Sequence, residues 1–188
     1  MAGQQTGMGR GKTYPASAAR HLLNPLRRLV QPPSRVVRRM SVAPDDRVLE
    51  LGCGPGWFSP ALATAVPRGS LTLCDVQPGM LAVAAERTSQ FAHVECVTAD
   101  AGDLPFADAS FDAVLLATVI GETADPMGCM LEVARVLAPS GVMTVCETRR
   151  DSDFTRFADL IELAGAVGLQ PAGRHGPPWE YTARFITL

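Results

Sequence analysis

Three glycines follow directly after a run of apolar residues in the segment VLELGCGPG, which spans residues 48–56. Gly52, Gly54 and Gly56 form a GxGxG pattern, in which the third glycine comes one residue earlier than in the GxGxxG pattern of dinucleotide-binding loops. Glycine lets a backbone approach a ligand closely, and the N–H groups that begin a following helix attract negative charge. By itself the pattern is a weak indication of a nucleotide-like ligand.

Several acidic residues could bind the ligand of such a loop or take part in its reaction. Asp75 ends the next apolar segment, 19 residues after Gly56, where a carboxylate can accept hydrogen bonds from both hydroxyls of a ribose. A capping role in the turn is the alternative for Asp75. Glu122 and Asp125 follow a later apolar segment and are the candidate catalytic or substrate-contacting residues, with solvated loop acids as the alternative.

Strand-like and helix-like segments alternate from residue 46 onward, which predicts an α/β fold with helices on both faces of a mostly parallel sheet. Strands are expected within 47–52, 70–75, 93–100, 111–120 and 142–148, and helices within 57–66, 78–91, 126–138 and 154–168. The remaining segment, 169–188, contains a Gly/Pro turn between two strands, so the last strand should run against the others. In an open parallel sheet ligands bind at the carboxyl ends of the strands, where the glycine loop and the acids would lie.

The composition limits the class of protein. With 188 residues, of which 47% are hydrophobic and 19% charged, the chain can form one sizeable core. No apolar run reaches the roughly 18 residues that cross a bilayer, and the N-terminus lacks the apolar core of a signal peptide, so we expect a cytoplasmic protein. Five cysteines without CxxC spacing indicate small buried residues in a reducing compartment and no metal site.

The net charge of −2 conceals a basic N-terminal arm. Residues 1–44 carry eight basic groups and no acid, so the remainder carries a balance of −10. We divide the chain into a tail at 1–13 that is disordered or left over from cloning, a helical arm at 14–43 and a body at 44–188. The arm could be a lid over an apolar substrate, a basic helix on an anionic membrane surface, or a surface helix packed on the body. The acidic body and the lack of interleaved aromatics in the arm argue against nucleic acid as a partner.

Four segments in order resemble the class I S-adenosylmethionine-dependent methyltransferases, most closely the small type 11 branch that acts on quinones, lipids and natural products. They are VLELGCGPG, LTLCDVQPGML, TADAGDLPFADASFDAVLLATVIGE and EVARVLAPSGVMTVCE. The resemblance covers about residues 44–188. It implies a Rossmann-like sheet of seven strands, mostly parallel with an antiparallel last strand, and a helical lid at the N-terminus.

The resemblance also implies the cofactor, S-adenosylmethionine, and the residues that bind it. The methionine end would lie over Gly52, Cys53 and Gly54, the ribose at Asp75, and the adenine amino group at Asp100, for which capping of its own loop is the alternative. The other cofactor-binding positions that it implies are Glu50, Gly56, Val76, Ala101 and Ala117. The expected reaction is in-line methyl transfer to a small apolar or lipid-like acceptor, whose acceptor atom and scaffold stay open, as does the oligomeric state.

Other polar and aromatic residues are further candidates for the substrate site. Many relatives carry a histidine after the fourth strand, where this chain has Gly121 and Glu122, so a histidine base from this loop is not expected. Glu147, at the end of the fifth strand, could bind substrate or pair with a neighbouring arginine. Tyr181 and Trp179 could line the pocket or belong to the core of the terminal hairpin. Two rival functions remain, a nucleotide-dependent oxidoreductase and a non-catalytic protein that binds the cofactor for regulation.

Overall fold

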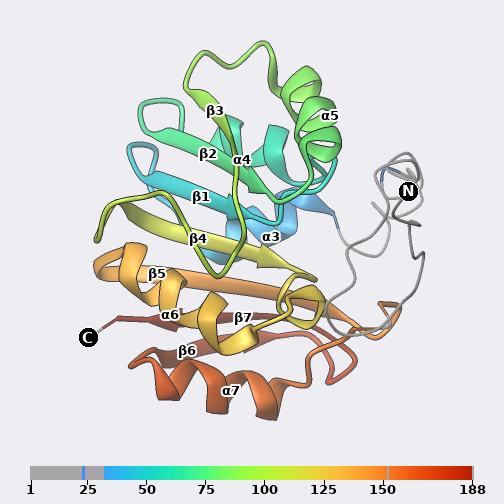
Figure 1. The fold of residues 1–188 in the computed structure, drawn as a ribbon, viewed down its shortest axis with the longest axis vertical. Coiled ribbons are helices and arrows are strands. Elements are labelled where there is room, and N and C mark those ends of the chain that lie inside the picture. The colour runs from blue at the N-terminus through green and yellow to red at the C-terminus, as the bar shows by residue number, and fades with distance from the viewer. Residues whose placement is uncertain (1–22, 24–31, 152, 188) are drawn as a thin grey trace, which may run out of the picture.

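The structure, a computed structural model, describes residues 23, 32–151 and 153–187. A seven-stranded sheet forms its centre, in the order β3-β2-β1-β4-β5-β7-β6 (Figure 1). The strands are β1 (Arg47–Leu51), β2 (Ser70–Asp75), β3 (Val94–Thr98), β4 (Phe111–Ala117), β5 (Leu137–Thr148), β6 (Gln170–His175) and β7 (Glu180–Ile186). The helices are α3 (Pro33–Met40), α4 (Ser59–Ala65), α5 (Pro78–Thr88), α6 (Pro126–Val136) and α7 (Phe157–Ala166), with a 3-10 turn η2 (Ile120–Glu122).

The strand directions confirm the predicted topology. β1 pairs in parallel with both β2 and β4, and β4 pairs in parallel with β5. β7 runs antiparallel to its two neighbours, β5 and β6, as the short hairpin connection requires. Strands β2 and β3 lie on one side of β1, whereas β4 and β5 lie on the other, so the strand order reverses between β1 and β4. The carboxyl ends of these two parallel strands lie at the same edge of the sheet.

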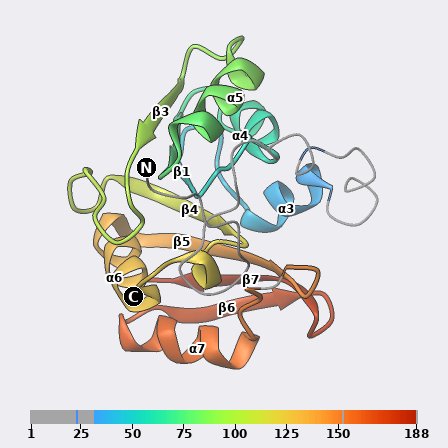
Figure 2. The same ribbon diagram turned by 45° about the vertical axis from the view of Figure 1, so that its right-hand side comes forward.

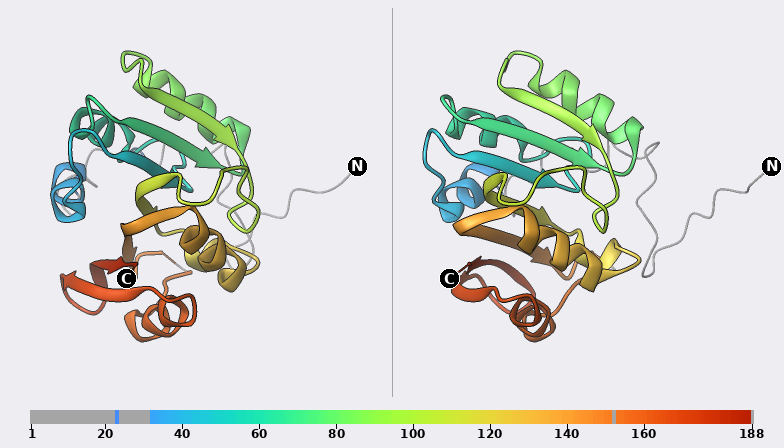
Figure 3. Two further views of the ribbon diagram at one scale, coloured as in Figure 1. Left: turned by 90° about the vertical axis from the view of Figure 1, so that its left-hand side faces the viewer. Right: turned by 60° about the vertical axis from the view of Figure 1, so that its left-hand side comes forward.

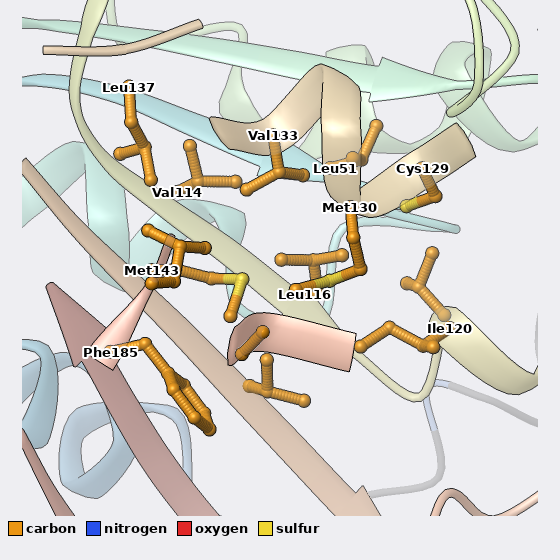
Figure 4. Close-up of a cluster of buried hydrophobic side chains, with 14 of the residues drawn as sticks. Leu51, Val114, Leu116, Ile120, Cys129, Met130, Val133, Leu137, Met143 and Phe185 are labelled. Atoms are coloured by element: carbon orange, nitrogen blue, oxygen red, sulfur yellow. The ribbon is translucent and has the colours of Figure 1, made fainter. Parts of the chain in front are cut away.

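Helices cover both faces of the sheet, so the central strands are apolar on both sides. Figure 3 shows α3 on one side of the sheet and α6 on the other. In β1, Val48 packs with α3, α4 and α5, whereas the next residue, Leu49, packs with α6 and α7. On the α6 side, Met130 and Val133 lie against Leu116 of β4 (Figure 4).

Helix α3, which belongs to the predicted arm, packs on the body, as in one of the three alternatives given for the arm. Helix α3 lies beside α4 (Figure 2). Its residues Val36 and Met40 are 2% and 1% exposed and pack with residues of β1 and α4. Arg39 Nη1 donates to Thr182 Oγ1 of β7 at 3.1 Å. Residues 33–40 therefore contribute to the core of the body. Leu23 packs against the same cluster, and the rest of the predicted arm lies outside the described residues, so its role as a lid stays a prediction.

Two further sequence predictions can be compared with the structure. Four of the cysteines are buried as expected, whereas Cys96 is exposed because it lies on the edge strand β3. None of the described helices has the length and apolar character needed to span a membrane.

Candidate functional site

The glycine loop connects β1 to α4 at the carboxyl edge of the sheet. Gly52 and Gly54 have φ values of 65° and 52°, a left-handed conformation that glycine adopts without strain. A Cβ added to Gly52 would overlap the side chain of Val119, so the loop packs closely on the chain that follows β4. A Cβ added to Gly54 would meet no atom within 4 Å. The loop thus presents bare backbone to open space at Gly54, as a ligand-binding loop should.

The third glycine serves helix packing. A Cβ on Gly56 would lie 3.1 Å from Ala84 Cα of α5, closer than most real contacts. Arg87, in the last turn of α5, donates from Nε to the Gly56 carbonyl oxygen at 3.1 Å and so holds the loop against this helix. Arg87 could not be found from the sequence, because nothing in its spacing relates it to the loop.

Asp75 reaches the glycine loop directly. The Gly54 N–H donates to Asp75 Oδ2 at 2.8 Å, and the Gln77 N–H donates to Oδ1 at 2.9 Å. Burial raises the pKa of the Asp75 carboxyl, and these two hydrogen bonds oppose the rise. A carboxylate has about four acceptor positions, so two remain for the hydroxyls of a ribose. Asp75 therefore contacts the glycine loop and also makes, through Gln77, the turn-capping bond that was the alternative; ribose binding stays a prediction.

Glu50 lies beneath the loop in β1, almost fully buried. Its Oε2 accepts a hydrogen bond of 2.6 Å from Ser59 Oγ, at the start of α4. Burial, reinforced by the charge of Asp75, raises the pKa of Glu50 to about 8, against the lowering effects of Ser59 and Arg87. Ser59 is a second residue that sequence reasoning missed. Its isolated position gives no signal until α4 is placed over β1.

Cys53 and the residues that follow β2 and β3 have simpler roles. Cys53 is buried, and burial raises the pKa of its thiol, so it suits packing and not nucleophilic attack. Val76 is 44% exposed although it is apolar, and it directly follows Asp75, as a wall for a flat base would. Asp100 accepts a hydrogen bond from the Gly102 N–H at 2.8 Å, which is the loop-capping alternative. Ala101 is half-buried beside it.

The chain bends sharply at the carboxyl end of β4, after the half-buried Ala117. Thr118 has a φ of 57°, which is strained for a β-branched residue, and its N–H donates to the Cys146 carbonyl of β5 at 2.9 Å. Strain of this kind is common beside functional sites. The bend leads into η2, which carries the half-buried Glu122.

The structure separates the two acids that the sequence paired as catalytic candidates. Asp125 caps α6, because its Oδ1 accepts from the N–H groups of Met127 and Gly128. Glu122 instead lies near Glu147, since its charge contributes to raising the pKa of that residue. A Cβ on Gly121 would overlap the Asp153 carbonyl oxygen, so a histidine at this position would require the two loops to separate.

Glu147, at the end of β5, is buried and does not form an ion pair with either neighbouring arginine, both of which are exposed. Its Oε2 accepts a long hydrogen bond of 3.4 Å from the Thr155 N–H. Tyr181, its partner across the β5–β7 ladder, is buried and donates to the Thr155 carbonyl oxygen at 2.7 Å. Trp179 is 58% exposed, so Tyr181 belongs to the core and Trp179 does not.

A small pocket of about 190 Å³ opens beside these residues, between η2 and α7. The residues that line it include Ile120, Gly121, Phe154 and Thr155.

The described histidines do not line this pocket. The Nε2 atom of His93 is hydrogen-bonded to the Ala63 carbonyl, and His175 is exposed on β6. Within the described ranges, no group of three or more His, Cys, Asp or Glu side chains could hold a metal ion.

The ends of β1 and β2 thus offer carboxylate acceptors suited to a diol beside an exposed apolar side chain, and a small pocket lies near η2 and α7. The family model described as a methyltransferase domain matches residues 49–145, which is just over half of the chain. A demethylmenaquinone methyltransferase from Staphylococcus aureus is 36% identical over 115 residues, or 61% of this chain and 48% of the relative. The match thus spans about half the length of the curated relatives.

Solved structures have the same fold. A SAM-dependent methyltransferase from Aquifex aeolicus superposes with a TM-score of 0.86 at 18% identity, covering 94% of this chain and all of the other. The N-methyltransferase NodS from Bradyrhizobium japonicum, solved with S-adenosylhomocysteine, gives a TM-score of 0.72 at 24% identity, over 87% of this chain and 88% of NodS. At these identities the likeness establishes the fold alone.

Proposed function

Because the chain belongs to the type 11 methyltransferase domain family of class I S-adenosylmethionine-dependent enzymes, we propose that it methylates a small, apolar, quinone-like acceptor. The observation that carries the proposal is the contact between Asp75 and the Gly54 N–H beside open space. This contact puts a carboxylate and bare backbone at one point, which is what a ribosyl ligand with a charged amino-acid end needs.

The residues present fit the cofactor. Gly52 to Gly54 would lie against its methionine end, Asp75 would accept its ribose hydroxyls, and Val76 with Asp100 would contact its adenine. Glu50 supplies a buried carboxyl beneath the loop, where a positively charged ligand would favour the ionised form. When bound, S-adenosylmethionine supplies a methyl group already activated by its positive sulfur.

One contribution of the chain to the reaction is to position the acceptor. Methyl transfer needs the acceptor to lie in line with the donor at about 3–3.5 Å, in a site from which water is excluded. The strained turn at Thr118 fixes the end of β4, and its bond to Cys146 ties that end to β5. The ends of β4 and β5 are therefore joined where the acceptor is proposed to lie.

The nature of the acceptor rests on the relative and on the pocket. The curated relative is named for demethylmenaquinone, an apolar quinone. The pocket beside η2 is lined by apolar side chains such as Ile120 and Phe154 and also by the polar residues Asp153, Thr155 and Asp159. A quinone-like ring suits such a surface. The segment before Pro33 is proposed to cover this site, and contact of its basic residues with an anionic membrane surface is a further proposal.

Two experiments test the proposed function. Calorimetric titration with S-adenosylhomocysteine and, separately, with NADH distinguishes a methyltransferase from an oxidoreductase. Incubation with methyl-labelled S-adenosylmethionine and a reduced demethylmenaquinone with a short side chain should then give a product heavier by one labelled methyl group in mass spectrometry. Binding without labelled product from this acceptor or from a cell extract would favour the non-catalytic alternative.

A further inference from the structure

Glu147 is a buried carboxyl with an unsatisfied oxygen atom. It is 1% exposed, and its Oε1 has no hydrogen-bond partner among the residues that the structure describes. The other oxygen has only the long bond from Thr155. A buried polar atom without a partner typically costs about 1–3 kcal/mol, so such an atom calls for an explanation. A ligand that supplies the missing hydrogen bond would explain it.

Glu147 lies directly behind Thr155, one of the residues that line the pocket beside η2, which is the proposed acceptor site. Thr155 connects the two, because its N–H donates to Glu147 and it also lines the pocket beside η2. The preceding residue, Cys146, accepts the hydrogen bond from Thr118 at the end of β4. Glu147 therefore stands one strand away from the turn that faces the glycine loop.

The charged groups around Glu147 come from several elements. Burial is the main reason that the pKa of Glu147 rises to about 8, and the charges of Asp151 and of Glu122 in η2 raise it further. Tyr181 faces it from β7 and is itself held by Thr155, and burial raises the pKa of its phenol. Arg174 of β6 stacks on Phe157 of α7, with its Cζ 4.9 Å from the ring centroid. With a pKa of about 8, the Glu147 carboxyl can exchange protons near neutral pH, which suits it to accept a proton from a weakly acidic hydroxyl.

We propose that Glu147 is the catalytic residue that binds a hydroxyl group of the acceptor through Oε1 and accepts its proton. The proposal rests on the proposed function, since it needs an acceptor at the ends of β4 and β5. Glu147 would also take the role of the histidine base that many relatives carry after the fourth strand and that is replaced by Gly121 and Glu122 in this chain.

The proton and electrons balance in this step. The acceptor's O–H bond breaks, and its proton goes to the ionised Glu147 carboxylate. The electron pair of that bond stays on the acceptor and makes it a stronger nucleophile. The acceptor would form its bond to the methyl carbon while the carbon–sulfur bond breaks, and that electron pair would remain on sulfur, which becomes neutral. Where the acceptor atom is a ring carbon, the hydrogen on that carbon then moves to the deprotonated oxygen and restores the hydroxyl. The carboxylic acid then returns its proton to water.

A binding experiment tests hydroxyl recognition without turnover. The probes are 1-naphthol and naphthalene, which differ by one hydroxyl, titrated by fluorescence in the presence of S-adenosylhomocysteine. The wild-type protein should bind 1-naphthol about tenfold more tightly than naphthalene. Glu147→Leu should remove this preference. The control Glu95→Gln, on the edge strand β3, should retain it, because a glutamine oxygen can still accept the hydrogen bond from Thr72. Equal wild-type affinities, or binding of neither probe, would overturn the proposal.

A pH profile tests the proton transfer. The carboxylate is the active form, so kcat/KM with the reduced quinone should rise as pH increases and level off above about 8. Glu147→Gln should lower kcat/KM by about a hundredfold or more and lose this rise, since an amide accepts no proton. A Glu147→Gln variant that keeps the rate and the pH profile would refute the role of Glu147 while leaving the methyltransferase function intact. Failure of the wild type to bind S-adenosylhomocysteine would instead refute the proposed function itself.

Discussion

Replacement of Glu50 by glutamine should stabilise the ligand-free protein in alkaline solution and weaken cofactor binding. Glu50 is 2% exposed, and its hydrogen bond from Ser59 can be made equally well to a glutamine oxygen. The substitution therefore removes a buried charge while keeping the shape and the hydrogen bond of the side chain. Any change in stability should come from the loss of ionisation.

The pKa of Glu50 sets the size and the sign of the effect. Its pKa rises from the ordinary 4.5 to about 8 in the folded protein. An acid with a raised folded pKa contributes full stability below its unfolded pKa and loses it as pH rises through the folded one. At about 1.4 kcal/mol per pH unit the loss approaches 5 kcal/mol. Water entry and local relaxation reduce such values, so we expect about 2–4 kcal/mol near pH 9.

Urea unfolding of the wild type and of Glu50→Gln between about pH 5 and pH 9 measures this difference. The two unfolding free energies should be close near pH 5, and the variant should become progressively more stable as pH rises. Glu147 titrates in the same range in both proteins, so its contribution cancels in the comparison. Glu95→Gln, on the exposed edge strand, is the matched control and should follow the wild type at every pH.

A constant difference between wild type and Glu50→Gln across this range would refute the reasoning. It would mean that Glu50 titrates near its ordinary pKa and that water reaches it in the folded state. Binding gives an independent check. Loss of the negative charge should weaken S-adenosylhomocysteine, which carries an ammonium group, by about tenfold.

Four other changes test the site. Asp75→Ala should weaken S-adenosylhomocysteine by about ten- to hundredfold in calorimetry, whereas Asp112→Ala, which loses a partly exposed ion pair at the opposite end of β4, should not. Gly54→Val should abolish this binding at a cost of about 1–3 kcal/mol in urea unfolding, because valine is strained at positive φ; normal binding would show that the loop is misplaced. Asp125→Ala should cost about 1 kcal/mol of stability through loss of the cap and leave kcat/KM unchanged; a large fall in kcat/KM would restore it as a catalytic residue. Removal of residues 1–31 should keep S-adenosylhomocysteine affinity within about tenfold but abolish methyl transfer, and full activity would exclude a lid.

The sequence predicted the fold because its signals are local and agree with one another. Apolar segments of strand length alternate with amphipathic segments, and the short Gly/Pro connection before β7 requires that strand to reverse. The same signals placed the glycine loop and Asp75 at one edge. The contact between Gly54 and Asp75 follows from parallel neighbours whose carboxyl ends meet.

Contacts between distant segments could not be predicted in this way. Helix α3 is short and basic, and its two buried residues have meaning only once β1 and α4 are in place. Asp125 carries the signature of a helix cap as much as that of a catalytic acid, and only the position of α6 separates the two readings. The role proposed for Glu147 likewise could not be predicted, because it depends on the contact with Thr155, a residue that lies beyond the end of β5.

Two buried glutamates flank the strand at which methyl transfer would occur. Glu50 lies in β1 and Glu147 in β5, the two neighbours of β4, and each pKa is raised to about 8 chiefly by burial. Glu50 faces the α4 side with Ser59, and Glu147 faces the α7 side with Thr155 and Tyr181. If burial served stability alone, apolar residues would fill these positions better. We infer instead that each acid is kept for a ligand, Glu50 for the cofactor and Glu147 for the acceptor. A double variant, Glu50→Gln with Glu147→Gln, should then be more stable than the wild type at high pH but inactive, which would show that stability is given up for ligand binding.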